Sequence, residues 1–199
     1  MFSLYHMLFQ IAIGKGKILN FALMGHSAGG HLALLYAYKS KLGGVNGIES
    51  KIPVSLVISE AGPTNFTLRQ DLLEGVASDQ ARMEYLLARN DEKESWENKL
   101  SNVSPINYVR SFSPTTILAY GNLYDESNNL TGTDGAIPYS QATAIYSVLG
   151  ESKCSLFGLT GVEHTQFGEG QKVCPNSQIS GEWENTVENY YDKIQEKLT

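Results

Sequence analysis

The chain has 199 residues, enough for one domain with a buried core, and its 42% hydrophobic and 18% charged residues exclude an intrinsically disordered protein. Its formal net charge is −6 and its lysines and arginines form no cluster, which argues against a nucleic-acid-binding protein because phosphate binding needs a basic surface. The apolar stretch at the N-terminus covers only about a dozen residues, too few to span a membrane, and lacks the basic flank and cleavage site of a secretory signal.

These features predict a single domain over residues 1–199, without a membrane-spanning segment and located in the cytoplasm. A secreted or periplasmic location is the alternative if the true N-terminus is missing. The two cysteines, Cys154 and Cys174, have the spacing of neither a disulfide framework nor a metal site. Two free thiols and one disulfide are both consistent with the sequence.

Short apolar runs bounded by turn residues predict strands that are buried on both faces of a sheet. Four such runs occur, at residues 18–24, 54–60, 115–120 and 153–159. Helices are predicted at residues 27–41, from Pro138 to about 149 and at 181–197, and the more polar segment 68–100 is predicted to be an excursion of helices over the sheet. Because parallel strands need crossover connections, this alternation predicts an α/β fold with a mostly parallel sheet flanked by helices.

Helical spacing identifies the faces that two of these helices are expected to bury. The helix after Pro138 places one set of apolar side chains on a single side: Ala142, Ile145, Tyr146 and Leu149. The C-terminal helix does the same with Trp183, Val187, Tyr190, Tyr191, Ile194 and Leu198. Both stripes are predicted to pack against the sheet.

The segment Gly25-His26-Ser27-Ala28-Gly29 reads G-x-S-x-G and lies between a predicted strand and a predicted helix. In this context the pattern is typical of a nucleophile elbow, a sharp turn that lifts a serine Oγ clear of the sheet edge. The turn is so tight that we expect a side chain at Gly25 or Gly29 to collide with it. Ser27 is therefore the candidate nucleophile, at a helix N-terminus where backbone N–H groups favour a developing negative charge.

A serine nucleophile needs a base, and the base needs an acid that orients it. Among the four histidines only His164 follows a late strand, in the loop GLTGVEHTQFGEG, so His164 is the candidate base. His26 is predicted to be a packing residue and His31 a hydrogen-bonded core histidine, whereas His6 shows no partner in the sequence. The acid should follow the third strand, where Asp125, Asp134 and, more remotely, Glu126 are the candidates.

Four strings together resemble a known family: GHSAGGHLALLYA, SPINYV (104–109), DGAIPYSQA (134–142) and GVEHTQFG (161–168). From about residue 17 onward the chain resembles the esterase/lipase branch of the α/β-hydrolases, which includes bacterial carboxylesterases, feruloyl-esterase-like proteins and kynurenine-formamidase-like enzymes. In that family the acid sits in a G-x-x-D-x-x-V-P-type string that leads into the next helix. Asp134 keeps this spacing to Ile137-Pro138 and is favoured, whereas Asp125 keeps the approximate spacing to the strand and is the alternative.

The family carries several strands and an HGG-type oxyanion loop ahead of the elbow, but here only 24 residues precede Gly25. The resemblance therefore implies a partial α/β-hydrolase fold that begins within the helix before the elbow strand. The Ala28 N–H can supply one oxyanion donor, while the second donor is missing. The missing strands would expose a sheet edge, through which the chain could self-associate or pair with another chain.

The leading hypothesis is a carboxylesterase- or lipase-like serine hydrolase that cleaves a small-molecule ester through Ser27, His164 and Asp134 by way of an acyl-enzyme. No metal and no organic cofactor are implied. Amide cleavage by a formamidase-like amidase or a peptidase would use the same residues. A hydrolase-like protein that has lost its catalysis together with the oxyanion loop is the alternative from another class.

Overall fold

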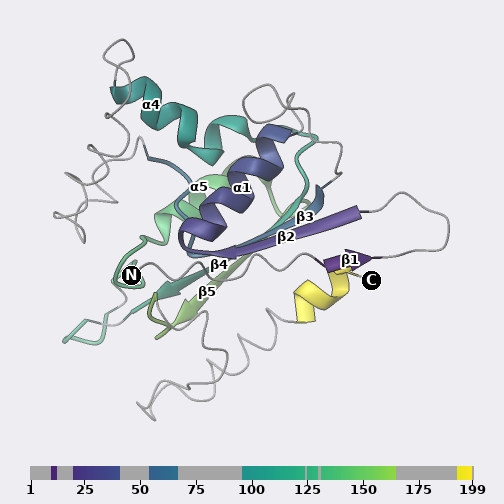
Figure 1. The fold of residues 1–199 in the computed structure, drawn as a ribbon. Helices are drawn as coiled ribbons and strands as arrows, with labels where there is room; N and C mark the ends of the chain where they lie inside the picture. The colour runs from purple at the N-terminus through teal and green to yellow at the C-terminus, as the bar shows by residue number, and fades with distance from the viewer. Residues whose placement is uncertain are drawn as a thin grey trace, which may run out of the picture.

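The computed structural model describes residues 10–12, 20–40, 54–66, 96–123, 125–129, 131–164 and 192–198. Five strands lie within these ranges: β1 (Gln10–Ala12), β2 (Asn20–His26), β3 (Val54–Glu60), β4 (Thr115–Asn122) and β5 (Cys154–Thr160). The helices are α1 (Ala28–Ser40), α4 (Trp96–Val103), the short 3-10 helix η1 (Pro105–Tyr108), α5 (Ser140–Leu149) and a further helix at 192–198. Figure 1 shows their arrangement.

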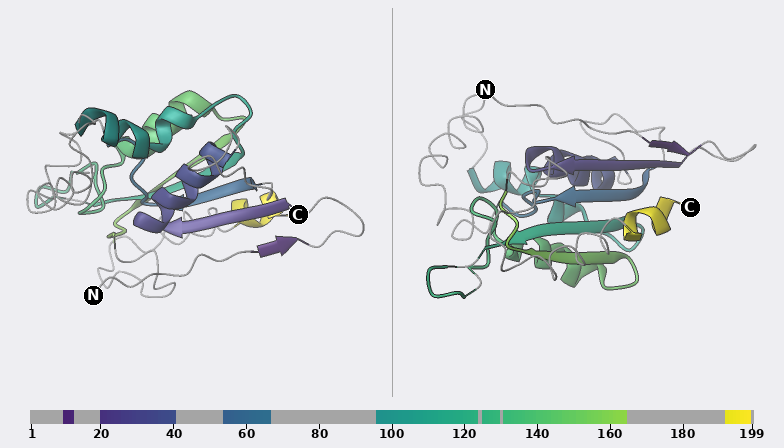
Figure 2. Two further views of the ribbon diagram at one scale, coloured as in Figure 1. Left: turned by 45° about the horizontal axis from the view of Figure 1, so that its top comes forward. Right: turned by 90° about the horizontal axis from the view of Figure 1, so that it is seen from below.

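The strands form one sheet in the order β1-β2-β3-β4-β5. Strands β2 to β5 are parallel to one another, whereas β1 runs antiparallel to β2. Viewed from below, the four parallel strands lie side by side in chain order (Figure 2, right). Their carboxyl ends therefore meet at one edge of the sheet, where each strand delivers its following loop.

Two apolar layers hold the sheet. On one face, Leu34, Ala37 and Tyr38 of α1 and Ile145 of α5 pack with strand residues such as Leu118. The opposite face carries a smaller cluster whose members are Leu56, Ile58, Ile117, Ala119, Leu159 and Val162, with Ile194 and Leu198 of the helix at 192–198 packed against it. Figure 1 shows α1, α4 and α5 above the sheet and the helix at 192–198, in yellow, below it. This arrangement of helices on both faces of a mostly parallel sheet confirms the predicted α/β fold class.

Within the described residues, the predicted order of the four parallel strands and of the helices after the first and third of them is confirmed, with the strand at 54–60 matching β3 residue for residue. The stripe predicted after Pro138 is buried as expected: Ala142 and Ile145 belong to the core, and Tyr146 and Leu149 pack against it. The helix itself begins at Ser140 rather than at the proline. The carbonyl of Pro138 instead accepts the Gln141 N–H in the turn that precedes the helix.

The expectation that the chain begins within a helix is wrong for residues 10–12, which form β1. Strand β1 pairs with the first three of the seven residues of β2, from Gln10↔Ala22 to Ala12↔Asn20, and so covers part of the edge that was expected to be exposed. The carboxyl half of β2 has no partner strand on that side among the described residues. Most of the predicted excursion at 68–100, and the predicted C-terminal helix before residue 192, lie outside the described residues.

The loop that follows β3 is fixed to α5 by one buried side chain, Gln141. Its Oε1 accepts the backbone N–H groups of Thr64 at 2.9 Å and Asn65 at 2.7 Å, and its Nε2 donates to the Asn65 carbonyl at 3.2 Å. Gln141 is fully buried, so leaving these groups unpaired would cost about 1–3 kcal/mol each. This interaction gives a physical role to the glutamine of the DGAIPYSQA string.

Candidate active site

The turn between β2 and α1 places Ser27 in a strained backbone conformation. Ser27 has a φ of 54°, in the left-handed region that non-glycine residues rarely adopt. The turn is held from two sides: the Ser27 N–H donates to the Glu60 carbonyl of β3 at 2.7 Å, and the His31 N–H of α1 donates to the Ser27 carbonyl at 3.0 Å. The serine is therefore fixed between the end of the sheet and the first turn of α1.

Close backbone packing behind the turn requires small residues. A Cβ at Gly25 would lie against the backbone carbonyl of Gly29, and one at Gly30 would lie 2.6 Å from the Ser59 Oγ of β3. The prediction that Gly29 also needs to lack a side chain is wrong, because a Cβ there would meet no atom within 4 Å. The second tight position is Gly30, which the G-x-S-x-G pattern does not include. It faces Gly62, which is equally tight, in the loop after β3.

Asp134 lies in the loop between β4 and α5 with only 1% of its surface exposed. Its Oδ1 accepts the backbone N–H groups of Ala136 at 2.9 Å and Ile137 at 2.6 Å, so the loop orients the carboxylate. Gly121 of β4 permits this approach, since a Cβ there would lie 2.7 Å from the Asp134 Cβ and even closer to the Val162 carbonyl. The second oxygen, Oδ2, remains directed at the loop after β5.

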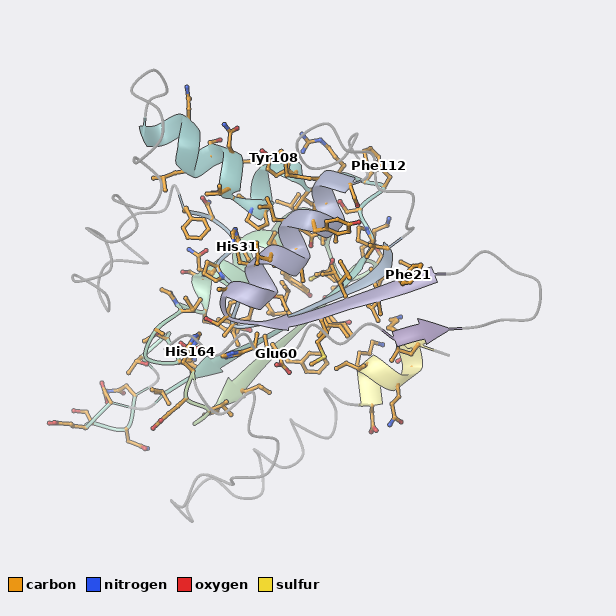
Figure 3. The ribbon with its side chains drawn as sticks, viewed as in Figure 1. Phe21, His31, Glu60, Tyr108, Phe112 and His164 are labelled. Carbon is orange, nitrogen blue, oxygen red and sulfur yellow. The ribbon has the colours of Figure 1, made fainter. Side chains whose placement is uncertain are left out.

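His164 connects the acid to the serine. Its Nδ1 is 2.8 Å from Asp134 Oδ2, and its Nε2 is 2.9 Å from Ser27 Oγ. The backbone N–H of His164 also donates to the Asp134 carbonyl at 2.9 Å. In Figure 3 His164 and Glu60 lie at the same end of the sheet, where α1 begins, whereas Phe21 lies at the other end. The structure thus brings Ser27, His164 and Asp134 into one hydrogen-bonded chain at the carboxyl edge of the sheet.

The alternative acid, Asp125, is exposed and serves its own loop. Its Oδ1 accepts the N–H groups of Ser127 at 2.9 Å and Asn129 at 2.8 Å. The hydrogen bond from the Asn129 backbone is the main reason that the pKa of Asp125 lies below its usual value. Glu126 is exposed in the same loop. The structure places Asp134, and not Asp125 or Glu126, against His164.

Two further histidines make hydrogen bonds near the turn. His26, the variable residue of the G-x-S-x-G segment, donates from Nε2 to the His164 carbonyl at 2.7 Å. His31 donates from Nε2 to the Val103 carbonyl of α4 at 2.7 Å, as expected for a hydrogen-bonded core histidine, and its ring packs edge-on against Phe66. His6 lies outside the described residues. His26 therefore does more than pack, because it binds the backbone of the candidate base.

Burial lowers the pKa of His31, and this makes the stability of the protein depend on pH. Unfolded histidine takes up a proton below about pH 6.5, while buried His31 stays neutral, so acidification favours the unfolded chain. We expect the thermal midpoint of the wild type to fall between about pH 7 and about pH 5 more steeply than that of His31→Gln, which keeps an N–H donor but does not titrate. Equal slopes, measured by circular dichroism, would contradict this role of His31.

The other positions singled out by the sequence are Ala28 and the two cysteines. Ala28 is exposed at the start of α1, where the first N–H groups of a helix have no intrahelical partner. Cys154 is a buried free thiol whose pKa is raised to about 12 by burial, whereas Cys174 lies outside the described residues. Within the described ranges, no three His, Cys, Asp or Glu side chains are grouped so as to hold a metal ion, and no helix is long and apolar enough to cross a membrane.

Residues 15–149 match the family model BD-FAE. No curated protein sequence matches the chain. Among solved structures, a truncated carbohydrate esterase from gut microbiota superposes with a TM-score of 0.52 at 18% identity, covering 88% of this chain and 58% of that chain. Esterase B from Lactobacillus rhamnosis gives 0.53 at 17% identity, covering 88% and 52%. Thermogutta terrifontis esterase 2, phosphoramylated by tabun, gives 0.51 at 18% identity, covering 88% and 54%. The chain thus spans little more than half the length of these structures, with which it shares the fold.

Proposed function

Because the chain belongs to the BD-FAE family of esterase-like α/β-hydrolases, we propose that it is a serine hydrolase that cleaves a carboxylic ester. The observation that carries the proposal is the hydrogen-bonded chain from Asp134 through His164 to Ser27, whose two links measure 2.8 and 2.9 Å. A serine hydroxyl is a weak nucleophile until a neighbouring base can take its proton, and a base held by a buried carboxylate meets that need.

In the proposed reaction Ser27 Oγ attacks the ester carbonyl while His164 Nε2 takes the hydroxyl proton. Asp134 Oδ2 keeps the other proton on Nδ1 and stabilises the imidazolium that forms. His164 then gives its proton to the departing alcohol, which leaves an acyl group on Ser27. A water molecule, deprotonated by His164, attacks the acyl carbon, and the collapse of this second intermediate releases the carboxylic acid and returns the proton to Ser27.

The negative charge of each tetrahedral intermediate needs hydrogen-bond donors. The Ala28 N–H, the residue after the serine in a nucleophile elbow, is proposed as one donor, at the N-terminus of α1. The second donor in this fold comes from a loop ahead of the elbow, and the described residues there are 10–12 and 20–26 only. If the chain acted with one oxyanion donor alone, its kcat would be about 10²- to 10³-fold lower than with two donors.

The test is covalent labelling by a fluorophosphonate probe, read by intact mass and peptide mapping. The wild type should gain one probe mass on Ser27, while Ser27→Ala should gain none and His164→Ala should react far more slowly. A folded wild type that gains no probe would overturn the proposal. Pairs of substrates, each an ester and an amide with the same acyl group, would then show whether esters are preferred over amides, as proposed. One pair would carry a formyl group and another an aminoacyl group.

A further inference from the structure

We propose that His26 is a positioning residue, which holds the backbone of His164 so that its imidazole stays aligned between Ser27 and Asp134. This inference rests on the proposed function of the same site. It is carried by the 2.7 Å hydrogen bond from His26 Nε2 to the His164 carbonyl, between residues 138 positions apart in the chain. The bond therefore connects the end of β2 directly to the loop after β5.

His164 is held at four points, and His26 supplies one of them. The side chain is held through Nδ1 by Asp134 and through Nε2 by Ser27. The backbone N–H is held by the Asp134 carbonyl at 2.9 Å. The backbone carbonyl is held by His26. The two backbone bonds lie on either side of the Cα of His164, so together they set the direction in which its side chain leaves the chain.

The hydrogen bond requires a hydrogen on Nε2 of His26, and burial keeps the ring neutral. A carbonyl oxygen only accepts, so Nε2 of His26 carries a hydrogen. Burial, followed by the nearby His164, lowers the pKa of His26, so the ring is neutral near pH 7. The two ring centroids are 4.9 Å apart. A neutral donor can hold the carbonyl without placing a second positive charge beside the imidazolium that His164 becomes during the reaction.

The geometry restricts which residues can do this at position 26. In register with Glu60 of β3, His26 is the last residue of β2, directly before the strained Ser27. A donor here must cross from the elbow to the His164 loop, which glutamine can also do and leucine cannot. His26→Leu removes the donor at similar volume, and His26→Gln retains an N–H donor that does not titrate.

The experiment measures kcat and KM for an ester, the rate of fluorophosphonate labelling and the thermal midpoint of these variants. Loss of alignment should lower kcat and the labelling rate of His26→Leu by about 10- to 100-fold with little change in KM, and His26→Gln should recover most of the rate. His31→Leu is the matched control, because it breaks a side-chain N–H···O=C bond of the same 2.7 Å length, to Val103, and keeps the backbone N–H that binds the Ser27 carbonyl. It should lower the thermal midpoint similarly, with a much smaller fall in kcat than in His26→Leu.

A second readout does not depend on catalysis. The Nδ1 proton of His164, shared with Asp134, should give a downfield NMR signal that persists in His26→Gln and His31→Leu and weakens in His26→Leu. Should the wild type label and His26→Leu label equally fast, the positioning role is wrong and the proposed function stands. Should the wild type fail to label, the proposed function is wrong. The NMR signal then decides the role of His26: loss only in His26→Leu supports it, and an unchanged signal overturns it.

Discussion

Replacement of Asp134 by asparagine is expected to lower kcat by about 10⁴-fold while the fold is kept. The reason lies in the two oxygens of the carboxylate. Oδ1 accepts two backbone N–H groups, from Ala136 and Ile137, so the carbonyl of an asparagine must take that place. The asparagine NH₂ would then face His164 Nδ1, which would have to accept. The proton of a neutral His164 would move to Nε2, where the proton of Ser27 has to arrive.

Asp125→Asn is the matched control for this change. It makes the same substitution in the same β4–α5 loop, but Asp125 is exposed, and its partners among the described residues belong to its own part of that loop. Its kcat should equal that of the wild type. Steady-state ester hydrolysis, with circular dichroism to verify folding, measures both variants. If Asp125→Asn were the inactive variant and Asp134→Asn the active one, the assignment of the acid would be reversed.

Gly25→Ala is expected to disrupt the turn that carries Ser27. Its Cβ would lie against the backbone carbonyl carbon and oxygen of Gly29, and a backbone cannot rotate away as a side chain can. Relief of this contact would push β2 and α1 apart, at a cost of about 1–3 kcal/mol in the free energy of unfolding. Displacement of Ser27 from His164 should also slow fluorophosphonate labelling by about 100-fold.

Gly29→Ala is expected to change the free energy of unfolding in the opposite direction. A Cβ at Gly29 meets no atom within 4 Å, and the residue lies in the first turn of α1. Alanine lowers the conformational entropy of the unfolded chain and favours a helix, so the free energy of unfolding should rise by about 0.5 kcal/mol. Urea unfolding of the two variants measures the contrast. Similar destabilisation by both alanines would show that the packing around Gly25 is not the cause.

The strands and helices could be predicted because the faces that they bury determine the spacing of apolar residues along the sequence. A strand covered on both faces, such as Val54–Glu60, needs an unbroken apolar run, and a helix covered on one face needs apolar residues at helical spacing. Strand β1 could not be predicted in this way. Only three residues of it pair with β2, and so short a segment carries no period.

The glycines also differ in whether the neighbouring sequence predicts their role. Gly25 belongs to a recognisable pattern, but the tightest contact at Gly30 is with Ser59 of another strand, and Gly62 of the loop after that strand is also close. The residues next to Gly30 in the sequence do not predict the contact with Ser59. Likewise the glutamine of the DGAIPYSQA string could be recognised as part of a resemblance, while its binding of Thr64 and Asn65 is visible only in the fold.

The sequence by itself determined the α/β alternation and singled out Ser27 and His164 as candidates, since each depends on residues next to it in the chain. The tertiary structure alone placed Asp134, rather than Asp125, against His164, and it alone showed that His26 binds the His164 backbone. The physical reason is chain separation: these contacts join residues 30 and 138 positions apart. The side chain that contacts His164 depends on the path of the loops, and the packed sheet fixes the ends of those loops.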